Sequence, residues 1–499
     1  MSDLTRRAAH GTALHLGAQL AVLGSAYIVA VVLARALGPA LYGVYGVVYS
    51  VLLTVELIGR LGIPQAVSKL VAERAGPSPQ LEATGVTLAL LVYLALFAGF
   101  WLAAPGMAAL FDIPDGTRLF RIAALDIPFY GLYFMVVHIL NGRRAFARES
   151  LASVLYGSVK AAGILALAWL GPTLEGALIV NVLGSVVALG FVLAAVGRSP
   201  FRFTVVEARP ILRLALPAAL IGFGSQLLLA LDLWALNVLG VAVAEAEKGL
   251  YVAASNIARI PNLLAFVMTA VLVPSLAHAL AAGDSGLARR SLLGAMRFLA
   301  ATLLPGCALI AANAGDIMAL LFSEDYAAGA GLLAILIFAQ GMGFTLFMTL
   351  GGVLMAADRA GQAAVLALGA LPLALLLNTL LIPRLGAPGA ALASLLALGT
   401  AVLLAAVLAR RRIGALVDPG MLARTLLVTL VVGLAGHLIA GRGTALLLEL
   451  AVLAGLALAL LALLGVVSRA DLEPFLPARL KPSPADPPAG PAPSGRAPP

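Results

Sequence analysis

TGVTLALLVYLALFAGFWLAA, residues 84–104, is an uninterrupted apolar run without a charged side chain. At about 1.5 Å of rise per residue, a helix of roughly 20 residues crosses the ~30 Å hydrocarbon core of a bilayer. A strand that crosses a membrane would alternate polar and apolar side chains, and this stretch does not. The run therefore predicts a transmembrane helix, because only a helix pairs its backbone groups within the segment.

Apolar runs of this length recur along the whole chain. Of its 499 residues, 62% are hydrophobic and only 11% are charged, and the mean hydropathy is +1.06. A soluble domain usually carries about a quarter charged residues, so too few are present to cover a globular surface. With Gly, Pro or charged residues between the runs, the pattern predicts an all-α membrane protein of about fourteen transmembrane helices. The predicted spans are 14–37, 41–63, 84–104, 119–140, 151–170, 175–196, 214–239, 249–276, 291–312, 327–354, 363–382, 387–409, 421–440 and 444–467.

The distribution of basic residues predicts the orientation. With these spans, most of the 32 Lys and Arg residues fall in alternate connections, on the side of the N-terminus. Cytoplasmic loops carry an excess of Lys and Arg, so we expect a multi-pass protein of the inner (cytoplasmic) membrane with both termini in the cytoplasm. The net charge of +9 then reflects orientation, and no nucleic-acid partner is expected. The lone Cys307 offers neither a disulfide framework nor a metal-ligand pattern, and we expect no cofactor.

An internal repeat indicates two related halves. Arg144–Ala145 is followed by Leu170–Gly171 at the same spacing at which Arg359–Ala360 is followed by Leu385–Gly386. In both segments a basic turn precedes a helix, a Leu-Gly turn and a second helix that opens near a Gly-Ala pair. The copies lie on predicted helices of the same orientation, which predicts a pseudo-two-fold axis along the membrane normal with the substrate path between the halves.

The repeat and the spans divide the chain into five parts. We expect an N-terminal six-helix lobe at 1–196, a cytoplasmic inter-lobe linker at 197–213 and a C-terminal six-helix lobe at 214–409. Two extra transmembrane helices occupy 410–467. Residues 468–499 are rich in Pro, Ala and Gly and cannot build a packed core, so a disordered cytoplasmic tail is expected there.

Three stretches resemble a known group of transporters. LARALGPALYGVYG at 33–46, followed by GRLGIPQAVSKLVAE at 59–73, resembles the opening of the polysaccharide exporter and O-antigen flippase families. NTLLIPRLGAPGAALASLLA at 378–397 resembles their late-helix pattern of an Asn, an Ile-Pro and a Gly-x-x-Gly-Ala. These families belong to the multidrug, oligosaccharidyl-lipid and polysaccharide flippase superfamily.

The resemblance implies two lobes around a central cavity that opens alternately to the two sides of the membrane. It also implies a function, the transfer of a polyprenyl-pyrophosphate-linked oligosaccharide from the cytoplasmic to the outer leaflet for surface polysaccharide biosynthesis. The chain would then be a transporter and not an enzyme. The glycan polymerase and the glycosyltransferases of that biosynthesis are candidate protein partners.

Cations inside the predicted spans are the candidates for substrate binding, because intramembrane charges are rare and costly. Lys160 and Arg259 lie near the middle of the fifth and eighth spans, Arg60 toward the cytoplasmic end of the second, and Arg35 near the outer end of the first. Such cations would offset the desolvation of a pyrophosphate, and Arg can bind phosphate oxygens through two N–H groups. The three arginines also fall on the first, second and eighth helices, which resembles the lipid II flippase with its cavity arginines on these helices. Arg35 is also close enough to the interface to snorkel.

Three acidic residues complete the candidate site. Asp126 lies toward the outer end of the fourth span, Asp232 in the outer third of the seventh, and Glu56 one turn before Arg60 on the same helix face. Each is a candidate counter-ion to the cations or a coupling site for H+ or Na+. Glu56 with Arg60 also fits a structural or gating ion pair.

Two other functions stay open. A multidrug or toxin extruder of the same superfamily, a cation-coupled antiporter, would favour aromatic and acidic cavity residues, whereas only 6% of this chain is aromatic. A membrane glycan polymerase or ligase would need a substantial external loop, and the longest expected ones, 105–118 and 313–326, hold no catalytic constellation. The sequence has no GxxxxGK[ST] pattern for ATP binding.

Overall fold

The structure is a computed structural model that describes residues 3–60, 62–74, 78–196, 202–240, 242–414, 416–439 and 443–466. These residues form helices and short connections and contain no strand. The elements, with a 3-10 segment η1 and a π-helical segment η2, are α1 (Asp3–Arg60), α2 (Ile63–Glu73), α3 (Pro79–Leu110), α4 (Gly116–Ala124), α5 (Asp126–Gly142), α6 (Phe146–Leu170), α7 (Leu174–Val196), α8 (Ala208–Leu239), α9 (Glu245–Ala258), α10 (Asn262–Ala281), α11 (Ser285–Ala312), α12 (Ala314–Leu321), η1 (Glu324–Gly329), α13 (Ala330–Leu336), η2 (Ile337–Gly343), α14 (Phe344–Ala356), α15 (Ala360–Leu385), α16 (Ala387–Ile413), α17 (Pro419–Leu438) and α18 (Thr444–Leu463).

Twelve helices among the described residues are long and apolar enough to cross a membrane. The first, Gly17–Glu73, includes most of α1, whose backbone leaves helical geometry at Gly38 (φ 72°, ψ 170°). Glycine accepts this positive φ because it has no Cβ, and Pro39 has no N–H to continue the helical pattern. α8 adds the shorter apolar stretch Phe223–Leu239. The all-α membrane fold is confirmed, and the number of about fourteen spans stays a prediction.

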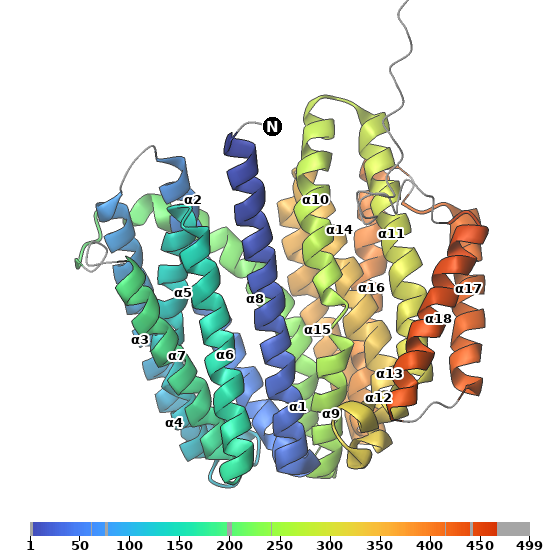
Figure 1. Ribbon diagram of the computed structural model, residues 1–499, viewed down its shortest axis with the longest axis horizontal. Coiled ribbons are helices and arrows are strands. Elements are labelled where there is room, and N and C mark those ends of the chain that lie inside the picture. Colours follow the sequence, from blue (N-terminus) through green and yellow to red (C-terminus); the bar gives the residue numbers. More distant parts are fainter. Residues whose placement is uncertain are drawn as a thin grey trace, which may run out of the picture.

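The break at Gly38 turns α1 into two arms. Figure 1 shows the N-terminus and α2 at one end of the molecule, so the first arm (3–37) runs to the other end and the second arm (39–60) returns. We call these ends the α2 end and the α4 end. The arms pass the same residue of α9, since the Tyr27 hydroxyl donates to the Asn256 carbonyl at 3.3 Å and the Asn256 amide donates to Tyr42 at 2.9 Å.

Three predicted spans are divided into shorter helices. The span 249–276 is α9 and α10, which meet at Arg259–Pro261 because proline lacks an N–H and disfavours helical geometry in the residue before it. The span 119–140 is α4 and α5, divided at Leu125. The span 327–354 contains the π-helical segment η2, a type of distortion that is frequent at functional sites.

Several segments expected outside the spans as loops are helical, among them 105–110 at the end of α3. The connection 313–326 forms α12 and the start of η1. Residues after the second predicted span form α2, in which Ile63, Val67 and Val71 are buried. Their spacing of four residues makes one apolar face that packs against neighbouring helices, a pattern that is too short to be recognised as a span.

The helices form two sides with a seam between them. In Figure 1, α3–α7 lie on one side, α10, α11, α14 and α16 on the other, and α1, α8 and α9 between them. α17 and α18 lie at the edge of the second side and pack against α11. We call α1–α7 the N-terminal half and α8–α16 the C-terminal half; a pseudo-two-fold axis between them stays a prediction. At the seam, a Cβ on Gly43 would lie 2.9 Å from the Gly249 nitrogen, so α1 and α9 pack backbone to backbone.

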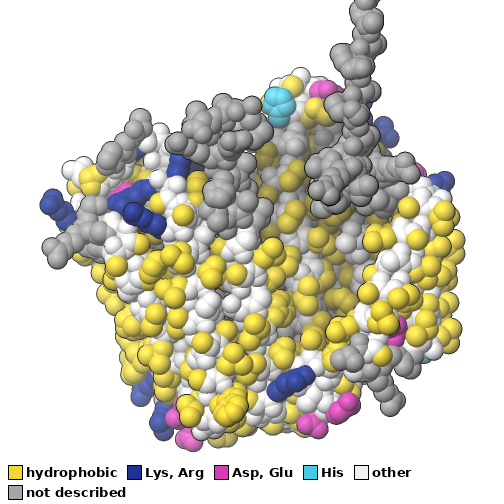
Figure 2. Space-filling view, in the orientation of Figure 1, with side chains coloured by type: hydrophobic (Ala, Val, Ile, Leu, Met, Phe, Trp, Pro, Cys, Tyr) yellow, Lys and Arg dark blue, Asp and Glu magenta, His cyan; other side chains and the backbone are white. Residues whose placement is uncertain are grey.

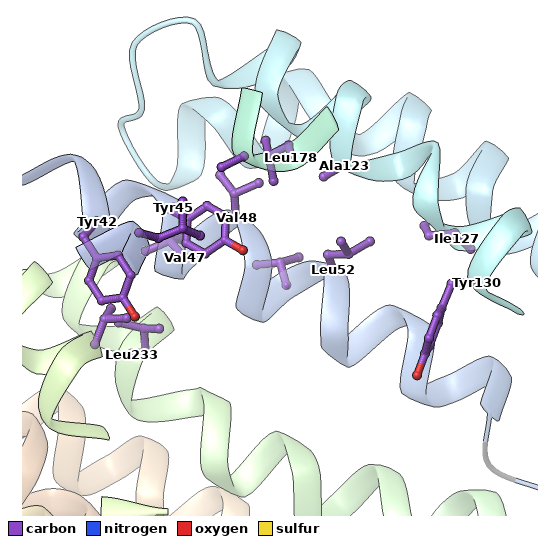
Figure 3. Packing of buried hydrophobic residues seen from close by; sticks show 14 of the residues in the cluster. Tyr42, Tyr45, Val47, Val48, Leu52, Ala123, Ile127, Tyr130, Leu178 and Leu233 are labelled. Atoms are coloured by element: carbon purple, nitrogen blue, oxygen red, sulfur yellow. The ribbon is translucent and has the colours of Figure 1, made fainter. Parts of the chain in front are cut away.

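The outside and inside of the molecule are both largely apolar. In the face shown in Figure 2, hydrophobic side chains cover the middle, while charged side chains gather toward the two ends, as expected for a surface in contact with lipid. Inside, the second arm of α1 is packed on several sides. Figure 3 shows Tyr42 next to Leu233 of α8, and Val48 next to Leu178 of α7.

At the α2 end, the described part of the linker is bound to the N-terminal half. Arg74 donates to both carboxylate oxygens of Glu207, at 3.0 and 2.8 Å, and the Thr204 nitrogen donates to the Thr87 hydroxyl at 3.2 Å. Of the predicted linker 197–213, residues 197–201 lie outside the described residues and 208–213 begin α8. The predicted tail 468–499 also lies outside the described residues.

Candidate functional site

A cavity of about 330 Å³ lies at the seam between the halves. It is bounded by both arms of α1, by α5 and α6, and by α8 and α9. Its charged lining residues are Lys160 and Glu56 from the N-terminal half and Arg259 from the C-terminal half. Its aromatic lining consists of five tyrosines, Tyr42, Tyr45, Tyr49, Tyr130 and Tyr156.

Lys160, on α6, is held by aromatic groups. Its ammonium donates to the Tyr156 hydroxyl at 3.0 Å and to the Tyr49 hydroxyl at 3.5 Å, and it lies 4.9 and 5.7 Å from the centroids of these rings. A Cβ on Gly184 would lie 2.5 Å from the Lys160 Cγ, so the glycine makes room for the lysine stem. Lys160 thus extends a flexible stem to the cavity, and the aromatic rings stabilise its ammonium group.

Arg60 lies next to the cavity, behind one of its tyrosines. Its guanidinium carbon is 5.3 Å from the centroid of Tyr130, which lines the cavity, and 4.5 Å from that of Phe134. In the part of the chain that the structure describes, no ion pair joins Arg60 to Glu56, although both lie on the second arm of α1. Aromatic rings contact this guanidinium directly, whereas Glu56 acts on it by its charge alone.

Glu56 and Asp126 form a buried pair of carboxyl groups in the N-terminal half. They are 2% and 1% exposed and lie within hydrogen-bonding reach of each other. The Asn181 amide nitrogen donates to one oxygen of Asp126. Glu56 Oε1 and Asp126 Oδ1 have no hydrogen-bond partner among the described residues.

Arg259 and Asp232 form a polar network in the C-terminal half. Arg259 lies at the break between α9 and α10, where its Nε donates to Gln340 Oε1 at 2.9 Å and its Nη2 to the Leu229 carbonyl at 2.6 Å. The Gln340 amide nitrogen donates in turn to Asp232 Oδ2 at 2.7 Å. The π-helical segment η2 carries Gln340, which thus links the cavity cation to a buried acid.

Asp232, 1% exposed, accepts hydrogen bonds from several directions. The Tyr251 and Ser394 hydroxyls donate to its Oδ2 at 2.6 Å each, and the Leu233 nitrogen donates to its Oδ1 at 2.7 Å. Together with Gln340, these groups supply what an ionised carboxylate needs away from water. Asp232 does not line the cavity itself, so its effect on a ligand would pass through Gln340 and Arg259.

The structure places Arg35 away from the cavity, at the α4 end. Its guanidinium donates to the carbonyls of Leu320 and Leu321 at 2.5 and 2.8 Å, which are the free carbonyls at the end of α12. The Tyr326 hydroxyl donates to the Ala34 carbonyl at 2.9 Å. These contacts join the two halves and form what we call the α4-end seal.

Sequence reasoning missed the tyrosines and the network around Asp232. Tyr42, Tyr45 and Tyr49 follow a spacing of three and four residues on one helix face, a pattern that could have predicted an aromatic wall. Gln340 and Ser394 had no such signal, because each is an isolated polar residue in an apolar run, far in sequence from Asp232.

Comparisons with known proteins agree with the resemblance and the fold predicted from the sequence. The structure is similar to the lipid II flippase MurJ in an inward closed conformation, with a TM-score of 0.73 and 15% identity over 90% of this chain and 97% of that chain. It is also similar to an inward-facing multidrug resistance MATE family transporter of the MOP superfamily, with a TM-score of 0.66 and 18% identity over 79% and 94% of the two chains. For a MOP superfamily transporter from Pyrococcus furiosus the TM-score is 0.56, with 16% identity over 82% and 95%.

At such low identity these similarities show the fold alone, that of MurJ and the MATE transporters. No curated protein matches the sequence. The family model for polysaccharide biosynthesis proteins matches residues 8–280, which is more than half of the chain. The chain therefore belongs to the polysaccharide biosynthesis protein family.

Proposed function

We propose that the protein is a flippase that moves a polyprenyl-pyrophosphate-linked oligosaccharide from the cytoplasmic to the outer leaflet by alternating access, for surface polysaccharide biosynthesis. The family and the transporter fold support this function at the coarse level. One observation carries it further: Lys160 from the N-terminal half and Arg259 from the C-terminal half line the same cavity. Two cations on opposite walls suit an anion that must pass between the halves.

The energetic argument concerns the charge of the pyrophosphate. A cation near the middle of a bilayer costs about 2.5–3.5 kcal/mol on insertion scales, so two of them in one cavity are hard to explain unless they serve a ligand. Arg259 can present a planar fork to phosphate oxygens, and Lys160 a mobile point charge. Arg60, one ring behind the cavity, would add to the positive potential. Arg35 would meet the cargo only when the α4-end seal opens, because its guanidinium is bound to helix carbonyls in this conformation.

The moving bodies would be the two predicted lobes, 1–196 and 214–409, with 197–213 as the linker and 410–467 as two additional helices. With the α2 end and both termini in the cytoplasm of a protein of the inner membrane, as the distribution of Lys and Arg predicts, the α4-end seal would separate the cavity from the outer side in this conformation. The polymerase and glycosyltransferases that make and extend the glycan would be its protein partners, and H+ or Na+ a coupling ion at Asp232, Asp126 or Glu56.

One observation favours a second candidate, a multidrug or toxin extruder. The cavity is lined by five tyrosines and by Glu56, the kind of lining that binds organic cations. Against it stand Lys160 and Arg259 in the same lining, which would repel a cationic drug. The balance of charge in the cavity therefore favours the anionic cargo.

Purified protein in lipid vesicles distinguishes the two functions. A fluorescent polyprenyl diphosphate carrying a short sugar chain should move between leaflets, as measured by the fraction that an impermeant quencher reaches. A lipophilic cationic dye should not accumulate in the same vesicles under a proton or sodium gradient. Transport of the dye without transfer of the lipid would overturn the flippase proposal.

A further inference from the structure

The carboxyl pair of Glu56 and Asp126 has fewer hydrogen-bond donors than two buried acids need. The Asn181 amide donates to Asp126, and among the described residues Glu56 Oε1, Asp126 Oδ1 and Asn181 Oδ1 have no partner. Asn181 is itself 3% exposed. Three unpartnered acceptor oxygens on buried side chains indicate that a hydrogen-bond donor or a cation is missing from this cluster.

Of the groups that face the pair, Asn181 and Ser185 hydrogen-bond to Asp126, yet Glu56 Oε1 and Asp126 Oδ1 stay without a partner among the described residues. The groups that face the pair are Tyr45, Tyr49 and Arg60 on α1, Tyr93 on α3, Tyr130 on α5, Tyr156 and Lys160 on α6, and Asn181 and Ser185 on α7. The two cations are directed elsewhere, Arg60 to the rings of Tyr130 and Phe134 and Lys160 to tyrosine hydroxyls. Within the described residues, neither cation forms an ion pair with Glu56 or Asp126.

Two adjacent carboxylates cannot both stay ionised in such a place. Their mutual repulsion and their burial both disfavour the doubly charged state, and one shared proton removes both penalties. We infer that Glu56 and Asp126 form a proton-binding site that holds one proton in the empty transporter, and that cargo binding at Lys160 draws a second proton onto the pair. This inference rests on the proposed function, since the cargo is the anionic lipid diphosphate.

The link to the cargo is electrostatic. Lys160 acts on both carboxyl groups, and Glu56 lines the same cavity as Lys160. When a diphosphate occupies the cavity, its negative charge cancels the field of Lys160, and the remaining negative charge of the pair becomes more costly. A proton from solvent then binds to the free carboxylate oxygen, and no bond of the cargo changes. By linkage, the protonated pair must favour cargo binding by the same factor.

The shared proton can be observed without any cargo. In the infrared spectrum of the full-length protein at neutral pH, the C=O stretching band of a protonated carboxyl should be present and should shift in D2O. The double variant Glu56→Gln, Asp126→Asn should lose this band, whereas Glu175→Gln, a matched change of a carboxylate paired with Arg118 at the α4 end, should keep it. An identical band in the wild type and the double variant would overturn the shared proton.

The second proton is tested with polyprenyl diphosphate as the probe. The protein is placed in weakly buffered detergent solution that contains a pH indicator. For each polyprenyl diphosphate bound, the wild type should take up as much as about one proton, and the double variant should take up none. Binding without proton uptake, or binding that requires Na+ instead, would contradict the inference and leave the flippase proposal intact. No binding of the diphosphate to the wild type would contradict the proposed function itself.

Discussion

The two halves of the molecule bury acidic residues in different ways. In the C-terminal half, Asp232 accepts hydrogen bonds from Tyr251, Gln340, Ser394 and the backbone, so both of its carboxyl oxygens have donors. In the N-terminal half, Glu56 and Asp126 lie side by side with unpartnered oxygens. The difference lies in the supply of hydrogen-bond donors, and it is the reason why we place the proposed proton site at the carboxyl pair and not at Asp232.

The cavity cations of the two halves also differ in how firmly their partners hold them. Arg259 is held in one geometry by Gln340 and the Leu229 carbonyl. Lys160 is held by tyrosine rings and hydroxyls, which constrain its direction less. The C-terminal half would thus provide a rigid fork for phosphate oxygens, and the N-terminal half a charge that can follow the cargo and respond to protonation.

The largest difference should appear in stability. Asp232→Asn puts an amide nitrogen, which cannot accept, where a carboxyl oxygen accepts from several buried donors, so the free energy of unfolding should fall by about 3 kcal/mol. Asp126→Asn should change it by less than about 1 kcal/mol, because the new amide can accept from Asn181 and donate to Glu56 in place of the shared proton. Cys307 is the only cysteine and is 1% exposed, so reaction of its thiol with a fluorescent reagent during heating reports unfolding.

Equal losses of stability for Asp232→Asn and Asp126→Asn, or a larger loss for Asp126→Asn, would contradict the proposed difference between the two acids. Thr400→Val, on an exposed face of α16, is a suitable control for the loss of one polar group that takes no part in either network.

A smaller difference should appear in cargo binding. Arg259→Lys loses the two-point attachment to Gln340 and the Leu229 carbonyl, so the Kd for polyprenyl diphosphate should rise about tenfold. Lys160→Arg keeps a cation over the rings of Tyr49 and Tyr156, and the Kd should change less than about threefold. Both values can be measured by ligand titration in detergent. Equal losses for the two substitutions would remove the distinction between a rigid and an adaptable cation.

The smallest effect on stability should come from the ion pair of Arg74 with Glu207, which binds the linker to the N-terminal half. This pair titrates at the surface and serves as a contrast to the buried carboxyl pair. The hydrogen bonds from Arg74 hold the pKa of Glu207 below its ordinary value. The folded state thus favours the ionised acid, so the pair stabilises the protein above the ordinary carboxyl pKa, and this contribution is lost as the pH falls through the lowered value. Because both side chains are partly exposed, Arg74→Ala should cost less than about 1 kcal/mol at neutral pH and nothing in acid.

The control for this titration is Lys69→Ala, which removes the exposed Lys69–Glu73 pair at 3.8 Å and should leave stability almost unchanged. Thermal unfolding of the three proteins across the acidic range gives the comparison. A cost of Arg74→Ala that persists at low pH would show that the arginine acts through packing and not through the charge of Glu207.

Much of the fold could be predicted from the sequence, because bilayer thickness fixes the length of the apolar runs. The reversal near Gly38–Pro39 was visible as a Gly-Pro pair between two spans. The break at Pro261 was not, since apolar residues continue on both sides of it and hydropathy is insensitive to a local bend. The amphipathic face of α2 was too short for a search that looks for spans.

The candidate site could be predicted only in part. Charges in apolar runs stand out, which is why Lys160, Arg259, Glu56, Asp126 and Asp232 could be named. Their partners could not, because Gln340 and Ser394 come from helices far away in the sequence and carry no charge. The partners of Arg35 could not be predicted either, because they are backbone carbonyls of another helix, which no sequence pattern reveals.

The central claim is that cations from both halves bind the anionic lipid during its transfer. The most direct test uses vesicles that contain the double variant Lys160→Ala, Arg259→Ala. It measures the movement of a fluorescent polyprenyl-diphosphate-linked sugar between the leaflets. The variant should reconstitute as the wild type does, and the protection of Cys307 should show that it stays folded at the assay temperature, although the loss of the Arg259 hydrogen bonds lowers its unfolding temperature. We predict that the double variant loses transfer between the leaflets while it still reconstitutes and stays folded. Transfer at the wild-type rate by the well-folded double variant would contradict the claim.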